Sequence, residues 1–338
     1  MRYPQIWDLL WCDAARDGSV DAMFIQDLIA RSGGLATADQ IHAVMSPKML
    51  RTHVRSGDVV RVCQGVYAVE QPGVVGRLAA LDLMTGRSIV ACMSTAANLH
   101  GFDTEGDERL HILDPGVRMR PSRSVMVHQR LGATLCRVDG RLVTAPAWTA
   151  IEVARSLRRP RTLATLDAAL RVGACTVDEM RVVVREHAGR RGIVRVRELL
   201  EHADGRAESP MESEARLVFI DGGLPTAELQ YEIEDRCGDL WRVDFAWPDA
   251  MLVAEYESME WHATSEALKH DRVKVARLQE CGYLTVPIVV DDVRRRPLDL
   301  VARIRTHLQA REDTNRPRSR EMRALSVCSR GNGVARAT

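Results

Sequence analysis

Residues 46–69 read SPKMLRTHVRSGDVVRVCQGVYAV, and this stretch decides the fold of the N-terminal region. Ser46 and Pro47 predict the start of a helix, because a serine side chain caps the first backbone N–H groups and proline fits the first helical position. A glycine–aspartate pair then predicts a turn, and the alternating residues around Gln64-Gly65 are typical of two short antiparallel strands. The stretch therefore predicts a basic helix without acidic residues, followed by a β-hairpin.

Two further helices are expected upstream of this stretch. Apolar residues at helical spacing stop at two glycines, and Thr37 can cap a second short helix. Three short helices and a hairpin are the order of a winged helix-turn-helix, in which the third helix lies in the major groove and the wing contacts phosphate. The nucleic-acid-binding candidates are Lys48, Arg51 and Arg55 on the helix and Arg61 on the wing. A winged helix used only for protein contacts or dimerisation is the alternative.

The overall composition excludes several classes of protein. The 338 residues include 47 basic and 46 acidic side chains, so the net charge of +1 gives no general attraction for a polyanion. No run of about 18 apolar residues occurs, so no membrane span is expected. The eight cysteines include no CxxC pair, which argues against a structural zinc site and favours the cytoplasm. Positive charge is local, because residues 155–206 carry twelve arginines against seven acidic residues.

The chain is expected to divide into four regions. The predicted boundaries are a winged-helix domain over residues 20–75, a mixed α/β scaffold over 76–207, a third domain over 208–310 and a disordered basic tail over 311–338. The scaffold is predicted to have a basic helical face, and its isolated histidines are expected to be structural. The tail is arginine-rich and poor in large apolar residues, which is typical of a segment that cannot form a core.

The third region carries the residues best suited to chemistry. Its expected order is helix, three strands, helix, strand and helix. Glu255 and Glu257 lie two apart on a predicted buried strand and so share a face, and Asp244 and Glu212 can converge with them. Buried carboxylates are costly unless a cation compensates them. Such a cluster suits Mg²⁺ or Mn²⁺, which can activate water and stabilise charge on a phosphodiester.

Several segments resemble known families. VDFAWPDAMLVAEYESMEWH, HDRVKVARLQECGY and SPMESEAR resemble the PD-(D/E)XK endonuclease-like domain of the very-short-patch-repair type, which is common in actinobacterial proteins. The run from GGLATADQI to GVYAV resembles the AbiEi-type winged-helix antitoxin domain. STAANLHGF and TLDAALRVGACT resemble the linker region of the same protein group. Together the resemblance covers about residues 20–310, in an order and spacing that match the group.

The endonuclease resemblance implies a role for each acidic residue. It implies that Asp244 and Glu255 bind the metal, that Glu257 completes the site or orients water, that Glu212 assists, and that His262 is the histidine that follows. These five residues are the catalytic candidates.

This sequence also departs from the family pattern in three places. Glu257 and Ser258 replace an aspartate and a glycine, and the superfamily's lysine is missing. Lys269 or Lys274 on the next helix can supply a displaced cation, although we expect them to be solvated surface lysines. Pro287 cannot donate to a sheet ladder, which predicts an edge strand or a bulge.

These observations predict an α/β protein with an N-terminal winged helix, a mixed middle region and a C-terminal restriction-endonuclease-like sheet flanked by helices. The first hypothesis is a DNA-binding transcriptional regulator of the type IV toxin–antitoxin, AbiEi-antitoxin class, whose endonuclease-like domain is degenerate. The second is a Mg²⁺-dependent DNA endonuclease targeted by the winged helix, and a third is a protein–protein adaptor. The expected partners are DNA and a cognate toxin, with a homodimer left open and no membrane association.

Overall fold

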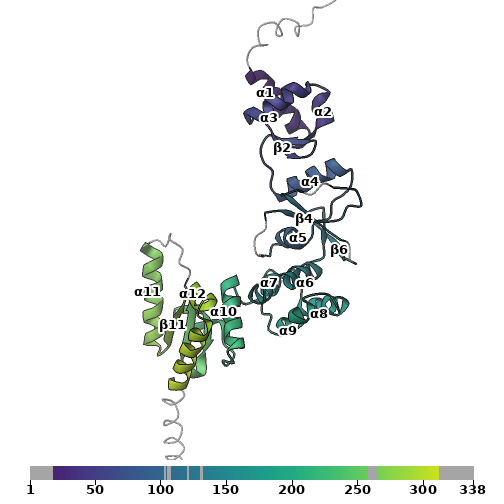
Figure 1. The fold of residues 1–338 in the computed structure, drawn as a ribbon. Coiled ribbons are helices and arrows are strands. Elements are labelled where there is room, and N and C mark those ends of the chain that lie inside the picture. The colour runs from purple at the N-terminus through teal and green to yellow at the C-terminus, as the bar shows by residue number, and fades with distance from the viewer. Residues whose placement is uncertain are drawn as a thin grey trace, which may run out of the picture. The chain divides into compact units, whose positions relative to one another are not determined.

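The computed structural model describes residues 18–102, 104, 108–119, 122–129, 132–257 and 265–311 (Figure 1). The chain forms two compact units, one made of residues 1–100 and 105–149 and the other of residues 101–104 and 150–338. His262 and the predicted tail beyond residue 311 lie outside the described residues. No described helix is both long enough and apolar enough to span a bilayer.

The first unit begins with three helices and a small sheet. These elements are α1 (Gly18–Arg31), β1 (Ala36–Thr37), α2 (Ala38–His42), α3 (Pro47–Ser56), β2 (Val60–Cys63) and β3 (Val66–Ala68), with the strands in the order β1-β3-β2. The predicted caps are confirmed: Thr37 forms a capping box with Gln40, and the Ser46 side chain accepts from the Met49 N–H. Gly57 ends α3 with a φ of 87°, which is accessible to glycine at little cost. These helices and strands follow one another in the order expected for a winged helix.

The rest of the first unit packs two strand pairs with two helices. The elements are α4 (Val74–Thr85), α5 (Met93–Leu99), the parallel pair β4 (Leu110–Leu113) and β5 (Val125–His128), and the hairpin β6 (Leu135–Val138) and β7 (Arg141–Thr144). Bridges from Ala91 to Ile112 and to Val143 connect the two pairs. The hairpin was not predicted, because its strands have only four residues each and carry little apolar pattern.

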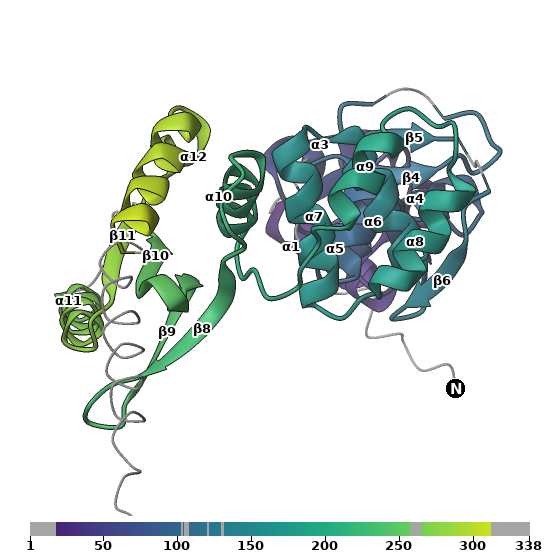
Figure 2. The ribbon, with the colours of Figure 1, turned by 90° about the horizontal axis from the view of Figure 1, so that it is seen from below.

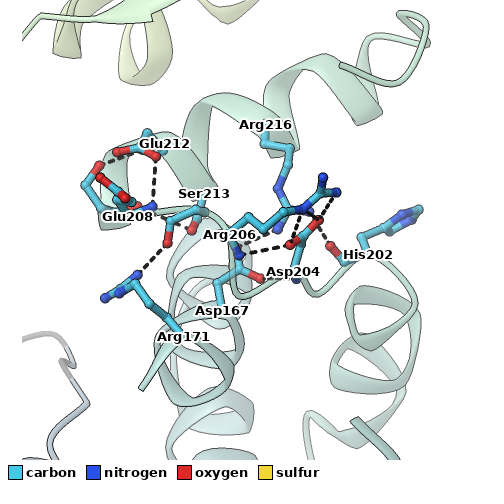
Figure 3. A network of polar contacts seen from close by, with 11 residues as sticks. Asp167, Arg171, His202, Asp204, Arg206, Glu208, Glu212, Ser213 and Arg216 are labelled. Atoms are coloured by element: carbon cyan, nitrogen blue, oxygen red, sulfur yellow. Dashed lines mark hydrogen bonds and ion pairs between the residues drawn. The ribbon is translucent and has the colours of Figure 1, made fainter. Parts of the chain in front are cut away.

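Five helices precede the C-terminal sheet, and the first of them begins in the first unit and continues into the second. They are α6 (Pro146–Ser156), α7 (Arg159–Arg171), α8 (Val177–Glu186), α9 (Ile193–Leu200) and α10 (Pro210–Asp221). A buried ion pair joins α7 to α10, with Arg216 Nη2 2.5 Å from Asp167 Oδ2 (Figure 3). The helix α9 was not predicted, although its buried residues Ile193, Val196, Leu199 and Leu200 follow helical spacing.

A four-stranded mixed sheet forms the centre of the C-terminal region. Its strands are β8 (Glu228–Glu234), β9 (Leu240–Trp247), β10 (Leu252–Tyr256) and β11 (Leu284–Ile288), in the order β11-β10-β9-β8, with β11 parallel to β10. The predicted edge position of Pro287 is confirmed, and its carbonyl accepts from Arg303 Nη2 at 3.2 Å. The expected helix–strand order of this region is therefore observed, while its identity as an endonuclease fold stays a prediction.

Helices cover both faces of this sheet (Figure 2). On one face, α11 (Ser265–Glu280) contributes Leu278 to a core with Val243 and Val253. On the other, α10, α12 (Val290–Arg294) and the helix over 297–311 pack on the sheet through Phe219, Val293, Leu300, Ile304 and Leu308. Both faces of β10 are thus buried, as its apolar run Leu252–Ala254 predicts.

Candidate functional site

The basic residues of α3 share one exposed face. Lys48, Arg51 and Arg55 are exposed and follow a spacing of three and four residues, so they lie along one side of the helix. Leu50 and His53 are buried on the opposite side. The face that points away from the core is therefore positively charged along two turns, which is the arrangement that a groove-binding helix needs.

The turn after α3 is fixed by a small polar network. His53 Nδ1 lies 2.8 Å from Asp58 Oδ2, and Ser56 Oγ donates to the same oxygen at 2.6 Å. The hydrogen bond from Ser56, and then that from His53, lower the pKa of Asp58. Because Asp58 is engaged here, it does not face the exposed basic residues as a free counter-charge. His53 serves the fold of this turn.

Arg61 lies on the wing, as predicted. It is exposed on β2, and its Nε donates to the Cys63 carbonyl at 3.2 Å. This bond occupies one side of the guanidinium and leaves its Nη groups facing solvent, where they can meet phosphate.

Two of the predicted acidic residues, Glu212 and Asp244, are linked where β8, β9 and α10 meet. Asp244 Oδ2 accepts from the Tyr256 N–H at 2.8 Å, where the ladder between β9 and β10 ends. Gln230 Nε2 donates to Glu212 Oε2 at 2.9 Å and lies 3.4 Å from Asp244 Oδ1. Gln230, which sequence reasoning missed, sits opposite Asp244 on β8 with a φ of 51°. This left-handed backbone is uncommon for a residue other than glycine.

Burial dominates the electrostatics of these carboxyl groups. It raises the pKa of Glu212, of Asp244 and of Glu255, and in Glu255 the nearby charge of Asp244 raises it further. Hydrogen bonds from Tyr256 to Asp244 and from Lys274 to Glu255 act in the opposite direction. Carboxylates whose pKa is raised by burial and by one another are typical of functional sites, although structural networks show the same shifts.

The expectation that Lys274 is a solvated surface lysine is wrong. Its Nζ forms an ion pair with Glu255 Oε2, and both side chains are 18% exposed. Lys274 lies one helical turn before the buried Leu278, so it shares the face of α11 that packs on the sheet. That spacing was the signal that could have identified it. Lys269 is exposed, as expected. A cation from α11 therefore lies beside Glu255 of β10.

Of the two remaining catalytic candidates, Glu257 does not join this cluster. Glu257 is exposed and lies one residue beyond β10, where its N–H donates to the Ile288 carbonyl at 2.8 Å. His262 lies outside the described residues. Across the described part of the chain, no group of three or more His, Cys, Asp or Glu side chains is arranged to hold a metal ion. A site with three such ligands is therefore not formed among the described residues, and a Mg²⁺ or Mn²⁺ site stays a prediction.

Replacing Glu212 by glutamine is expected to raise the free energy of unfolding by about 1 kcal/mol at pH 7. Because burial raises the pKa of Glu212, its carboxylate form opposes folding at neutral pH. Denaturant unfolding of both proteins should show the gain in stability shrinking as the pH falls, since wild-type Glu212 then becomes protonated.

Glu214→Gln, on the same helix, is the control for this prediction. Glu214 is buried but accepts two hydrogen bonds of 2.9 Å from Arg294, so removing its charge should destabilise the protein. A Glu212→Gln protein less stable than wild type at pH 8 would show that the charge is compensated.

Comparison with known proteins identifies two domains. Residues 23–69 match the family described as "Transcriptional regulator, AbiEi antitoxin", and residues 89–202 match "AbiEi antitoxin C-terminal domain". The second match covers most of residues 76–207, the region that we predicted from the sequence to be a scaffold and linker. A crystal structure of the RV2827C protein from Mycobacterium tuberculosis has a TM-score of 0.41 and 15% identity, covering 63% of this chain and 87% of that one.

Two relatives from Mycobacterium tuberculosis are much more similar. Uncharacterized protein MT2308 (strain CDC 1551 / Oshkosh) and Uncharacterized protein Rv2248 (strain ATCC 25618 / H37Rv) are each 61% identical over 264 residues, 78% of this chain and 97% of theirs. The chain belongs to the family of these two mycobacterial proteins and contains the transcriptional-regulator and C-terminal domains of the AbiEi antitoxins.

Proposed function

We propose that the protein is a DNA-binding transcriptional regulator of the antitoxin type, which binds its operator through α3. The observation that carries the proposal is the exposed, acid-free face of α3 formed by Lys48, Arg51 and Arg55, within the segment that matches the AbiEi regulator. Arg61 on the wing adds a contact to phosphate. The match to the AbiEi antitoxin C-terminal domain supports a cognate toxin as a second partner.

Lys48→Ala/Arg51→Ala is expected to weaken operator binding by about tenfold or more, because each basic side chain at the groove contributes charge and hydrogen bonds. Band shifts on the DNA upstream of the gene, at several salt concentrations, measure this effect. The slope of log affinity against log salt should fall by up to about two, since each lost phosphate contact removes about 0.9 from it.

The matched control for this experiment is Arg31→Ala. Arg31 is on α1, 79% exposed and paired only with Asp27 within its own helix, so its removal should leave DNA binding unchanged. Equal affinity of wild type and of Lys48→Ala/Arg51→Ala would refute the assignment of α3 to the groove. A loss of the same size in Arg31→Ala would show a general charge effect instead.

A second candidate function, DNA cleavage, is favoured by one specific contact. The Lys274–Glu255 pair places a cation beside Asp244 and Glu255, which is the residue combination that the endonuclease resemblance implies. In such a site the lysine can stabilise negative charge on a phosphodiester, while a carboxylate orients water. The same two side chains form a partly buried ion pair, so they serve equally as charge-compensated residues of a degenerate site.

A plasmid cleavage assay distinguishes an active endonuclease from a degenerate site. Wild type, Asp244→Ala/Glu255→Ala and Lys274→Met are incubated with supercoiled plasmid and Mg²⁺ or Mn²⁺. Nicking by wild type that both variants abolish supports an endonuclease. If wild type leaves the plasmid intact while it still shifts operator DNA, the cleavage function is refuted and the regulator stands.

A further inference from the structure

A cavity of about 580 Å³ lies where α6 ends and α7 and α9 begin. It is lined by Arg155, Ser156, Leu157, Arg158, Arg191, Gly192 and Arg195. Four of the lining residues are arginines and none is acidic, so the walls are strongly positive. The volume falls within the range of small-molecule binding sites, which is about 300–1,000 Å³.

Two of these arginines are held in place by the fold. Arg155 donates to both oxygens of Glu152, at 2.7 and 2.6 Å, and its Nη1 donates to the Arg191 carbonyl at 3.2 Å. Arg195 Nη2 donates to the carbonyls of Leu157 and Arg155, at 2.5 and 3.1 Å. The carbonyls at the end of α6 thus position the Arg195 guanidinium without neutralising it.

Positive charge remains on two of the four arginines, because Arg155 pairs with Glu152 and Arg158 lies 4.0 Å from Glu214. No carboxylate among the described residues forms an ion pair with Arg191 or Arg195. Arg195 Nε is buried and has no hydrogen-bond partner in the described part of the chain. A buried N–H group without a partner is unfavourable, so this guanidinium gains from any acceptor that can reach it. Glu152, the nearest acid, is already occupied by Arg155, His187 and Arg190.

The N-termini of two helices add to the positive electrostatic potential at this cavity. Neither α7, which begins after Arg158, nor α9, which begins after Gly192, has a side-chain cap at its N-terminus. The positive ends of both helices therefore lie at the cavity. Gly192, with a φ of 85°, permits this close approach, because a Cβ there would lie 2.4 Å from the Arg155 carbonyl. The loop before α9 is held tightly against α6, which keeps Arg191 at the rim.

We propose that this cavity binds the phosphate group of a phosphate ester. The forked guanidinium donors of Arg191 and Arg195 match the oxygens of a phosphate, and a second phosphate or a sugar fits the remaining volume. The ester comes from one of two sources, a nucleic-acid backbone or a free nucleoside phosphate. The site is separate from α3 in the sequence and does not depend on the operator contact.

Calorimetric titration of the full chain with sodium pyrophosphate and with adenosine diphosphate tests the site. Arg191→Gln/Arg195→Gln is expected to weaken pyrophosphate binding by at least about tenfold, because it removes two charge-assisted donors. Arg197→Gln is the matched control, since Arg197 is exposed on the same helix and does not line the cavity. If the double variant fails to fold, Arg191→Gln alone carries the test, because that side chain is exposed.

A duplex of 16 random base pairs, added to proteins that also carry Lys48→Ala/Arg51→Ala, identifies the source. A fall of about two in the salt slope on removing both cavity arginines assigns the site to nucleic-acid phosphate. If removing both arginines leaves the salt slope unchanged but abolishes pyrophosphate and nucleotide binding, the cavity is assigned to a free phosphate ester. Absence of pyrophosphate binding by wild type, or equal binding by wild type and the cavity variants, overturns the proposal.

Discussion

Replacing Arg216 by methionine is expected to lower the free energy of unfolding by about 3–5 kcal/mol, the range for removing one partner of a buried ion pair. Asp167 is fully buried between α7 and α10, and Arg216 Nη2 lies 2.5 Å from its Oδ2 (Figure 3). Arg216 Nη1 also donates to the His202 carbonyl at 2.6 Å. Without the guanidinium, a charged carboxylate is left inside the protein with the Asp204 N–H, 2.8 Å away, and Ser213 as its partners.

The loss of stability should depend on pH in a defined direction. Burial raises the pKa of Asp167, and the charge of Arg216 is the largest effect that opposes it. Removing Arg216 therefore raises the pKa of Asp167 in the folded state further above its value in the unfolded chain. The penalty is greatest at neutral and alkaline pH and shrinks as the pH falls and Asp167 becomes protonated. Urea unfolding at pH 5 and pH 8, followed by tryptophan fluorescence, measures the difference.

Arg206→Met is the matched control for Arg216→Met. Arg206 pairs with Asp204 in the same network at 2.7 Å, but its side chain is 61% exposed. An exposed pair contributes at most about 1 kcal/mol, so this variant should unfold nearly as the wild type does. Equal losses in the two variants, or an Arg216→Met loss that grows at acidic pH, would contradict the assignment.

Gly192→Ala is expected to destabilise the second unit by about 2–5 kcal/mol. About 1–2 kcal/mol comes from placing a Cβ on a left-handed residue, and about 1–3 kcal/mol from forcing it against a neighbour. The neighbour is the Arg155 carbonyl, 2.4 Å from the built Cβ, and a backbone atom cannot rotate away as a side chain would. Thermal or urea unfolding of the full chain measures the loss.

Gly189→Ala separates the two contributions. Gly189 has a φ of 83°, close to that of Gly192, but a Cβ there meets nothing within 4 Å. Its variant should lose only the backbone part, about 1–2 kcal/mol. If both alanine variants unfold alike, the contact between the α9 loop and α6 is looser than the structure shows, and the arginine cavity would not be held open by it.

Local patterns were sufficient to predict much of this fold. The Ser46-Pro47 start, the Gly57 stop and the Thr37 cap each follow from chemistry within a few residues, and all three are observed. The order of elements around the C-terminal sheet also follows from apolar periodicity. By contrast, β6, β7, α9 and α12 were not predicted, because they are short and are stabilised by contacts from elsewhere in the chain.

The candidate site was harder to predict, because its contacts join distant segments. Lys274 meets Glu255 from a helix 19 residues away, and Gln230 bridges Glu212 and Asp244 across two elements. No local pattern fixes such pairings, although the phase of α11 indicated which face Lys274 would take. Pattern reasoning therefore named Glu212, Asp244 and Glu255 as neighbours, but it also included Glu257, which lies outside the cluster. It did not identify the cation and the amide that contact these acids.

The edge strand β11 has a consequence for how this protein behaves at high concentration. An open sheet edge normally offers N–H and C=O groups on which another chain can add a strand, and this leads to aggregation. Near the C-terminal end of β11, Pro287 has no N–H to offer, and its carbonyl accepts from Arg303 Nη2 at 3.2 Å. Intermolecular strand addition is thereby opposed at this end of the edge, and Pro287→Val should make the protein more prone to form insoluble oligomers.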